Sequence, residues 1–204
     1  MHYTFDLSKD YVLENKCVLL RPLTFEDCNN LRYFSLNEPE IWTYSSQKAA
    51  GEANLVKYIE FALQARKTGK EYPFIVFDKR TQAYAGSTRF YDIQPDHKML
   101  QLGFTWYGKA FQGTGLNKNC KYLLLQFAFE QMGMERVEFR ADHNNTRSIA
   151  AMKSIGCTVE GVLRSHAIKL DGSRRDSIIL SILKQEWEFQ VKDSLWRKIR
   201  LDNQ

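Results

Sequence analysis

Two glycines precede the most strongly apolar helical segment of the sequence, in the loop 111–117. Gly113 and Gly115 leave backbone N–H groups uncovered by side chains, and the helix that follows contributes the positive end of its dipole. The residues before the loop, 99–106, are apolar at every second position, as in a strand. Such a loop can hold a pyrophosphate, although an ordinary glycine turn would have the same residues.

The loop does not match two familiar nucleotide-binding loops. It lacks the Lys-Ser or Lys-Thr pair of a P-loop, and it has no third glycine at the spacing of a dinucleotide fold. Nucleotide binding through this loop would predict tight ATP binding, and the missing lysine argues against it. Both interpretations are therefore disfavoured.

A second group of candidate residues begins a later helix. Asn145 and Ser148 lie one helical turn apart, so both side chains point from the same helix end toward the loop. A hydroxyl in that position can supply a proton to a departing group. Both residue types are also favoured at helix caps, so a purely structural role is the competing interpretation.

His166 is the candidate proton acceptor. It lies in a predicted strand between Ser165 and Ala167, and imidazole groups exchange protons near neutral pH. It shares strand parity with Arg164 and Glu160, so the three could line one face. A structural histidine, hydrogen-bonded across the hairpin, is the alternative.

The elements that position these residues follow from hydrophobic periodicity and from cap and turn residues. Asp171-Gly172, between two predicted strands, is a strong hairpin signal. The predicted strands cover 17–21, 73–79, 83–93, 99–106, 136–141, 158–170 and 173–183, and the predicted helices begin near 24, 50, 116, 145 and 186.

The composition is that of a folded globular protein. Of the 204 residues 44% are apolar, and only 11 are glycine and 4 proline, which excludes disorder and a flexible linker protein. No apolar stretch approaches the roughly 20 residues of a membrane span. The first residues show no basic region followed by an apolar one, so we expect no signal peptide and a cytoplasmic protein.

Cysteine spacing and net charge indicate which kinds of ligand and partner to expect. Cys17, Cys28, Cys120 and Cys157 are far apart and form no CxxC pair, so we expect free thiols and no metal site. The net charge of +5 is mild and suits an anionic small ligand as well as nucleic acid. No basic run with interleaved aromatic residues favours nucleic acid. We therefore expect small-molecule ligands, with neither nucleic acid nor membrane as partner, and a homo-oligomer is compatible with the sequence.

The loop and its neighbours together resemble a known family. The motif Gln112-x-x-Gly115-x-Asn117 is similar to the Q/R-x-x-G-x-G/A signature with which GNAT acetyltransferases hold the pyrophosphate of acetyl-coenzyme A. The resemblance extends to 102–106 before the loop and to 145–148 and 155–164 after it. It covers about residues 15–185 and is greatest for the branch that contains the bacterial ribosomal-protein amino-terminal acetyltransferases.

This resemblance implies both the fold and the reaction. The fold class would be α/β (α+β), a single GNAT-like domain over 1–204 with its core at about 15–185 and a carboxyl-terminal helix at 186–204. A mixed, mostly antiparallel sheet flanked by helices would be splayed between strands 99–106 and 136–141 to admit acetyl-CoA. The reaction would be direct transfer of the acetyl group from acetyl-CoA to a primary amine, without a metal.

The family's functional residues carry over to this sequence one by one. Ser148 would protonate the departing thiolate, and Asn145 would contact the pantetheine arm. The acceptor side would include Trp42 and Tyr44, which lie between the first two helices, and Arg164. The residues that would contact acetyl-CoA are Phe104, Thr105, Trp106, Gln112, Gly113, Thr114, Gly115, Leu116, Asn117 and Asn145.

Two positions depart from the family pattern. Asn117 replaces the final Gly or Ala of the signature, where the backbone approaches the cofactor. Gln101 stands where many relatives carry an acid, so the usual carboxylate base is missing, and a non-catalytic acyl-CoA-binding or regulatory module is the alternative function. The acceptor stays open among a protein amino terminus, a polyamine, an aminoglycoside and an amino acid, because acceptor choice lies in the variable segment 24–70.

Overall fold

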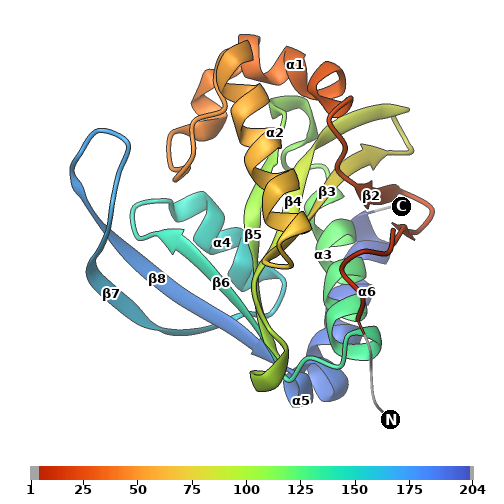
Figure 1. Cartoon of the computed structure of the whole chain (residues 1–204). Helices are drawn as coiled ribbons and strands as arrows, with labels where there is room; N and C mark the ends of the chain where they lie inside the picture. Colours follow the sequence, from red (N-terminus) through yellow and green to blue (C-terminus); the bar gives the residue numbers. More distant parts are fainter. Residues whose placement is uncertain (1–4, 203–204) are drawn as a thin grey trace.

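A mixed sheet forms the centre of the molecule, and helices cover both of its faces (Figure 1). The computed structural model describes residues 5–202. Within that range the sheet has eight strands in the order β1-β2-β3-β4-β5-β6-β8-β7. The strands are β1 (Leu13–Glu14), β2 (Val18–Pro22), β3 (Glu71–Asp78), β4 (Ala83–Gln94), β5 (Met99–Tyr107), β6 (Arg136–Asp142), β7 (Thr158–Ile168) and β8 (Arg174–Leu183).

The helices divide between the two faces, and each face has its own hydrophobic core. On one face α1 (Asp27–Asn37) and α2 (Glu52–Lys67) contribute Leu31 and Ile59 to the core. On the other, α3 (Leu116–Gln126), α4 (Thr146–Ser154) and α6 (Lys192–Asp202) supply the core, and the short α5 (Lys184–Glu186) precedes α6. The apolar helix that the sequence predicts after the glycine loop is α3, and its Leu116, Cys120 and Leu124 are fully buried.

The sheet opens between β5 and β6. These two strands are parallel, and they pair through Met99↔Arg136, Leu100↔Val137 and Gln101↔Glu138. β5 then continues to Tyr107 and β6 to Asp142 with no further pairing between them in the described residues. The splay predicted from the family resemblance is therefore confirmed, and it begins just beyond Gln101.

A β-bulge lies in β5 where the strands part. Thr88 of β4 lies opposite two residues of β5, Phe104 and Thr105, because the register shifts between Ser87 and Arg89. Phe104 has a φ of 47°, a value that is uncommon for an aromatic residue. A bulge bends its strand and withdraws backbone groups from the ladder of hydrogen bonds. The bulge thus turns β5 away from β6 and exposes backbone groups beside the opening.

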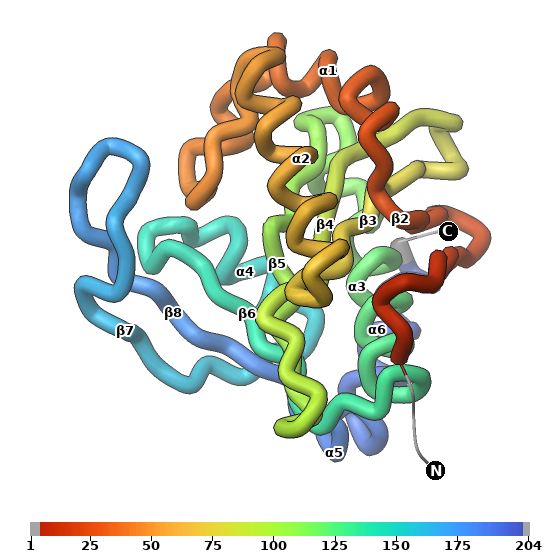
Figure 2. Tube along the Cα trace, in the orientation of Figure 1, coloured from red at the N-terminus to blue at the C-terminus, as the bar shows by residue number. Residues whose placement is uncertain are grey.

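Strands β7 and β8 form a hairpin that projects from the body, at the left of Figures 1 and 2. The predicted strands and the turn at Asp171-Gly172 are confirmed. Gly172 has a φ of 84°, and the Lys169 N–H donates to the Ser173 carbonyl at 2.8 Å across the turn. The hairpin extends the sheet beyond β6: β8 pairs with β6, and β7 is the edge strand.

The hairpin is less regular than the sequence suggests. Its register shifts between Val159 and Gly161 and again between Leu163 and Ala167, so simple alternation does not hold along β7. Glu160 forms an ion pair with Arg136, whose hydrogen bonds lower the Glu160 pKa to about 2. The face that we expected Glu160, Arg164 and His166 to share is interrupted by these bulges.

Two further sequence expectations concern membranes and metals. Within residues 5–202 no helix combines the length and the apolar character that crossing a bilayer requires. The same residues contain no group of three or more His, Cys, Asp or Glu side chains that could hold a metal ion. The four cysteines are free thiols.

Candidate active site

The glycine loop leads into α3, as the sequence predicts. Gly113 and Gly115 have φ values of 76° and 79°, in the left-handed region that favours glycine. Gly115 is the N-cap of α3, so the backbone N–H groups of the first helical turn point toward the loop. A Cβ built on Gly113 would meet no atom within 4 Å. This open space at the positive end of the helix dipole fits a pyrophosphate.

Arg80 is hydrogen-bonded to the glycine loop, and this contact has no signal in the sequence. Its guanidinium binds Asp78 through Nε–Oδ1 and Nη2–Oδ2 distances of 3.0 and 2.7 Å, and its Nη1 donates to the Thr114 carbonyl at 2.9 Å. Burial raises the pKa of Asp78, but the hydrogen bonds from Arg80 outweigh that effect and lower it below its ordinary value. The ion pair therefore stays charged at neutral pH and sets the loop's shape before a ligand binds.

Gln112 and Asn117, the ends of the loop motif, both contact Tyr107. The Gln112 Nε2 donates to the Tyr107 carbonyl at 2.8 Å, and the Asn117 Oδ1 accepts from the Tyr107 hydroxyl at 3.3 Å. The amide that replaces the family's small residue is thus engaged with Tyr107. The Gln112 Oε1 accepts a hydrogen bond from Arg147 of α4, which joins the loop to the second helix start. Arg147 was not among the predicted site residues.

Asn145 and Ser148 lie at the start of α4. The Asn145 Oδ1 accepts from the backbone N–H of Ser148 at 3.1 Å, so the structural capping role is present. The bond uses the Ser148 amide and leaves the serine hydroxyl out of the cap. Through the contact between Arg147 and Gln112, this helix start is held beside the glycine loop.

Side chains at 104–106 are engaged inside the protein. The Phe104 ring packs on the Arg89 guanidinium at 4.2 Å, and the Trp106 Nε1 donates to the Tyr58 hydroxyl at 3.3 Å. The Thr105 hydroxyl lies 2.7 Å from Lys121 Nζ. What this strand can offer a cofactor is therefore mainly the backbone of its bulge.

Lys121 is a buried cation that sequence reasoning missed. It projects from the inner face of α3, and its ammonium group contacts the hydroxyls of Thr105 and Thr88 at 2.7 and 3.4 Å. Burial lowers its pKa to about 8. A lysine in an apolar helix face gives no sequence signal, because long side chains usually extend to solvent.

On the opposite face, Trp42 lines a pocket of about 290 Å³. The indole ring packs against Trp106 at 5.1 Å, and its Nε1 has no hydrogen-bond partner among the described residues. Leu170, from the turn of the β7–β8 hairpin, also lines this pocket. Tyr44 is 44% exposed and is not one of the residues that line the pocket, which are Pro39, Trp42, Thr43, Lys48, Ala50, Asn54 and Leu170.

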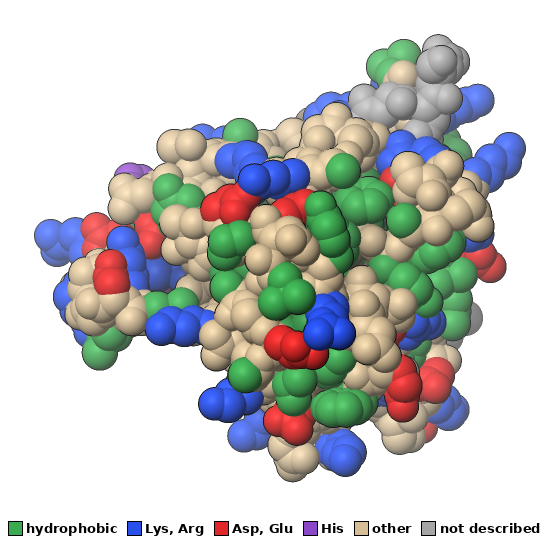
Figure 3. All heavy atoms as spheres, turned by 90° about the horizontal axis from the view of Figure 1, so that it is seen from above, with side chains coloured by type: hydrophobic (Ala, Val, Ile, Leu, Met, Phe, Trp, Pro, Cys, Tyr) green, Lys and Arg blue, Asp and Glu red, His purple; other side chains and the backbone are tan. Residues whose placement is uncertain are grey.

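His166 and Arg164 belong to the hairpin and are both exposed. The His166 Nδ1 lies 3.1 Å from the Ser177 hydroxyl, and Ser177 pairs with Asp142 at the end of β6, three residues before Asn145. Seen from above, basic side chains gather on the projecting hairpin (Figure 3). Strand β8 thus separates His166 from β6, the strand that borders the opening, and Arg164 is exposed on the same hairpin.

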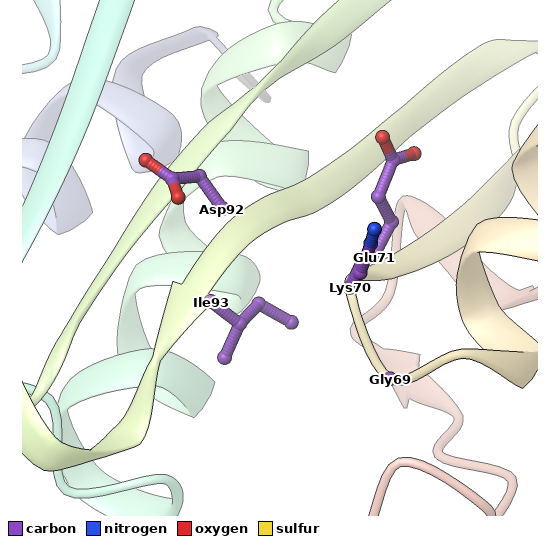
Figure 4. A pocket seen from close by; sticks show the side chains of 5 residues that line it. All are labelled: Gly69, Lys70, Glu71, Asp92 and Ile93. Carbon is purple, nitrogen blue, oxygen red and sulfur yellow. The ribbon is translucent and has the colours of Figure 1, made fainter.

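Gln101, the position where an acid is missing, is hydrogen-bonded to one. Its Nε2 donates to Asp92 Oδ2 at 2.7 Å, and its Oε1 is buried without a partner among residues 5–202. Asp92 borders a second pocket, of about 360 Å³, together with Glu71 (Figure 4). In this view Asp92 points away from Glu71, whose carboxylate pairs with Arg89 at 2.7 Å. A carboxylate therefore lies beside Gln101 even though residue 101 itself is an amide.

Comparison with known proteins gives consistent results. Residues 18–158 match the sequence profile of the acetyltransferase (GNAT) domain. The chain is 25% identical over 170 residues to the uncharacterized N-acetyltransferase p20 of Bacillus licheniformis, covering 82% of this chain and 93% of that protein. Among solved structures, one assigned as an acetyltransferase from T. thermophilus is 33% identical with a TM-score of 0.81, covering 92% of this chain and 96% of that one.

A further relative matches a shorter part of the chain. The protein YdaF of Bacillus subtilis, assigned as a ribosomal N-acetyltransferase, is 29% identical over 103 residues. The match covers 50% of this chain and 55% of that protein. The family profile, the two sequence relatives and the solved structure therefore agree on acetyl transfer as the shared activity.

Proposed function

The chain belongs to the GNAT family of N-acetyltransferases, and from this premise we propose that it transfers an acetyl group directly from acetyl-CoA to a primary amine, either a protein amino terminus or a small-molecule amine. The observation that carries the proposal is the opening between β5 and β6, with the start of α3 and the start of α4 held together beside it. A cofactor could enter there and reach the acceptor face.

The residues of the chain fit acetyl-CoA at this opening. Bound there, acetyl-CoA supplies an activated thioester. The N–H groups of the glycine loop bind the pyrophosphate, because the space beside Gly113 is open and the helix dipole favours negative charge. Asn145 contacts the pantetheine arm, and Ser148 donates a proton to the sulfur as it departs. No metal is required by this arrangement.

The acceptor enters from the face that carries Trp42. The pocket beside Trp42 combines apolar side chains with the polar Thr43 and Asn54, a mixture that suits the end of a peptide. The similarity to YdaF, which is assigned as a ribosomal N-acetyltransferase, supports the same choice. We therefore place a protein amino terminus first among the acceptors. Free thiols at all four cysteines are compatible with a cytoplasmic enzyme.

A non-catalytic acyl-CoA-binding module is the alternative, which Gln101 favours. Asp92 weakens that alternative, because its carboxylate lies 2.7 Å from the Gln101 amide. The deciding experiment measures free coenzyme A released from acetyl-CoA with a panel of amines: peptides with different first residues, a polyamine, an aminoglycoside and amino acids. We expect release with peptides and an acetylated amino terminus in the mass spectrum. Acetyl-CoA binding without release with any amine would support the module, and tight ATP binding would support a nucleotide site.

We expect His166→Gln to remove the acidic limb of the kcat/KM profile against pH while the melting temperature changes little. The reason is that an imidazole which accepts the amine proton must be neutral to do so, whereas glutamine does not titrate. His166 lies on the hairpin beside Ser177, near the end of β6. The measurement is initial rate over a pH series at low acceptor concentration.

Two results would return His166 to a structural role. One is an acidic limb that persists unchanged in His166→Gln. The other is a drop in melting temperature that accounts for the lost activity, since the ring contacts Ser177 across the hairpin. Ser173→Ala serves as the control for hairpin stability. It removes a hydroxyl that donates to Asp171 Oδ1 at 2.7 Å in the hairpin turn, and it should leave the acidic limb in place.

A further inference from the structure

Tyr91 of β4 extends across the neighbouring strand β5. A Cβ built on Gly103 of β5 would lie 2.9 Å from the Tyr91 Cε1 and 3.4 Å from its hydroxyl oxygen. The ring is therefore in contact with the backbone of Gly103, and a side chain at position 103 would displace it. Tyr91 pairs with Gln101, so the ring runs diagonally along β5, away from the end where the strands pair.

The Tyr91 hydroxyl is placed where the sheet opens. Gly103 lies two residues beyond Gln101, the last residue of β5 that pairs with β6. The Tyr91 ring meets the Phe104 ring edge to face at 5.0 Å, and Phe104 is part of the bulge. The charges that act on the hydroxyl include Arg140 and Glu138, which belong to β6 on the far side of the opening. The phenol thus spans from β4 to the gap between β5 and β6.

The Tyr91 hydroxyl is protonated at neutral pH, so it can donate a hydrogen bond. Burial raises the pKa of Tyr91 to about 12. The group therefore stays protonated at neutral pH and does not serve as a base. A donor held in a partly buried site stabilises a developing negative charge more effectively than water does, because it need not reorient.

We propose that the Tyr91 hydroxyl donates a hydrogen bond to the carbonyl oxygen of the acetyl group while that oxygen gains negative charge. This inference rests on the proposed acetyl transfer. In that transfer the acceptor nitrogen forms a bond to the acetyl carbon, the carbon–sulfur bond breaks, one proton leaves the nitrogen and one is returned to sulfur. Tyr91 keeps its own proton throughout, so its role is electrostatic.

Tyr91→Phe tests the assignment, because it keeps the ring over Gly103 and removes the hydroxyl. We expect kcat to fall roughly 100-fold, the usual effect of removing one such donor, with coenzyme A affinity in calorimetry unchanged. Tyr122→Phe is the matched control: it also removes a phenol hydroxyl, but its ring packs against Trp187 and Trp196 on the outer side of α3. The control should keep full turnover.

A spectroscopic measurement separates hydrogen bonding from positioning without any turnover. The probe is acetonyl-CoA, an unreactive ketone analogue, with a ¹³C-labelled carbonyl. We expect the carbonyl stretching frequency of the bound analogue to be lower in the wild type than in Tyr91→Phe, because a hydrogen bond weakens the carbonyl bond. Gly103→Ala should raise the frequency as well, since its Cβ would push the Tyr91 ring aside.

Several results would overturn the assignment. Full turnover in Tyr91→Phe would do so, and so would reduced turnover with an unchanged carbonyl frequency, which would make Tyr91 a packing residue. In both cases the wild type still acetylates amines, so the proposed function stands. A wild type that neither binds the analogue nor releases coenzyme A contradicts the proposed function, and the Tyr91 assignment falls with it.

Discussion

Replacing Gly113 by valine should weaken coenzyme A binding roughly 100-fold and leave the fold intact. The side chain would occupy the space beside Gly113 that is now open to 4 Å, and phosphate could no longer reach the backbone N–H groups. Hydrogen bonds to charged groups contribute about 1.5–3 kcal/mol each, and a tenfold change in affinity corresponds to about 1.4 kcal/mol. Losing one or two such bonds therefore gives the expected effect, which calorimetric titration with coenzyme A measures.

Gly172→Val is the matched control for backbone strain. Gly172 has a φ of 84°, close to the 76° of Gly113, and a Cβ built on it also meets nothing within 4 Å. Valine at either position incurs a similar conformational cost, because a β-branched residue is strained at positive φ. Only Gly113→Val should lose affinity. Equal losses in both variants, or none in Gly113→Val, would show that this glycine is not part of a phosphate cradle.

The elements of the fold were largely predictable because their signals are local. The strand at 99–106, the apolar helix after the glycine loop and the Asp171-Gly172 turn each depend on a few neighbouring residues, and each appears in the structure. The opening between β5 and β6 is different. It could be predicted only from the family resemblance, since strand pairing joins residues far apart in the chain.

The structure differs from the predicted strands where tertiary contacts determine the backbone conformation. The bulge that gives Phe104 a φ of 47° has no sequence signal, because an aromatic residue rarely adopts that conformation. The bulges in β7 likewise break the expected alternation of Glu160, Arg164 and His166. In both strands a period of two was assumed, and one inserted residue is enough to reverse it.

The motifs of the candidate site were predictable from the sequence, but the contacts that support them were not. The glycine loop and the Asn145 cap are found where the sequence placed them. Arg80 and Arg147 were missed, because the destination of a long basic side chain depends on residues distant in sequence: Arg80 reaches Thr114, and Arg147 reaches Gln112. The same holds for Tyr91, whose position follows from the absence of a side chain at Gly103 on the next strand.

The hydrogen bond between Gln101 and Asp92 bears on whether the missing acid at position 101 excludes catalysis. From the sequence, Gln101 favours a module without catalysis. In the structure its amide donates to Asp92 at 2.7 Å, so the place that the family's acid would occupy still has a carboxylate next to it. A test for catalysis should therefore come from the groups that act on the thioester, whose loss has a large and specific effect on rate.

Ser148→Ala is that test, and we expect it to lower turnover roughly 100-fold or more while coenzyme A affinity stays nearly unchanged. A positioned acid that protonates the departing thiolate contributes about this much to the rate. The substitution should not disturb α4, because the cap bond of 3.1 Å joins the Asn145 Oδ1 to the backbone N–H of Ser148, which alanine retains. Single-turnover kinetics, in which chemistry limits the rate, measure the effect.

The control for Ser148→Ala is Ser154→Ala, at the other end of the same helix. The Ser154 hydroxyl donates to the Ala151 carbonyl at 2.7 Å, so its loss removes a hydroxyl from α4 far from the helix start and should leave turnover unchanged. Tyr107 is poorly suited to replace Ser148, because it is buried and its hydroxyl donates to Asn117 Oδ1 at 3.3 Å. Full single-turnover rate in Ser148→Ala would therefore leave solvent as the proton source and reduce Ser148 to a residue of the α4 cap.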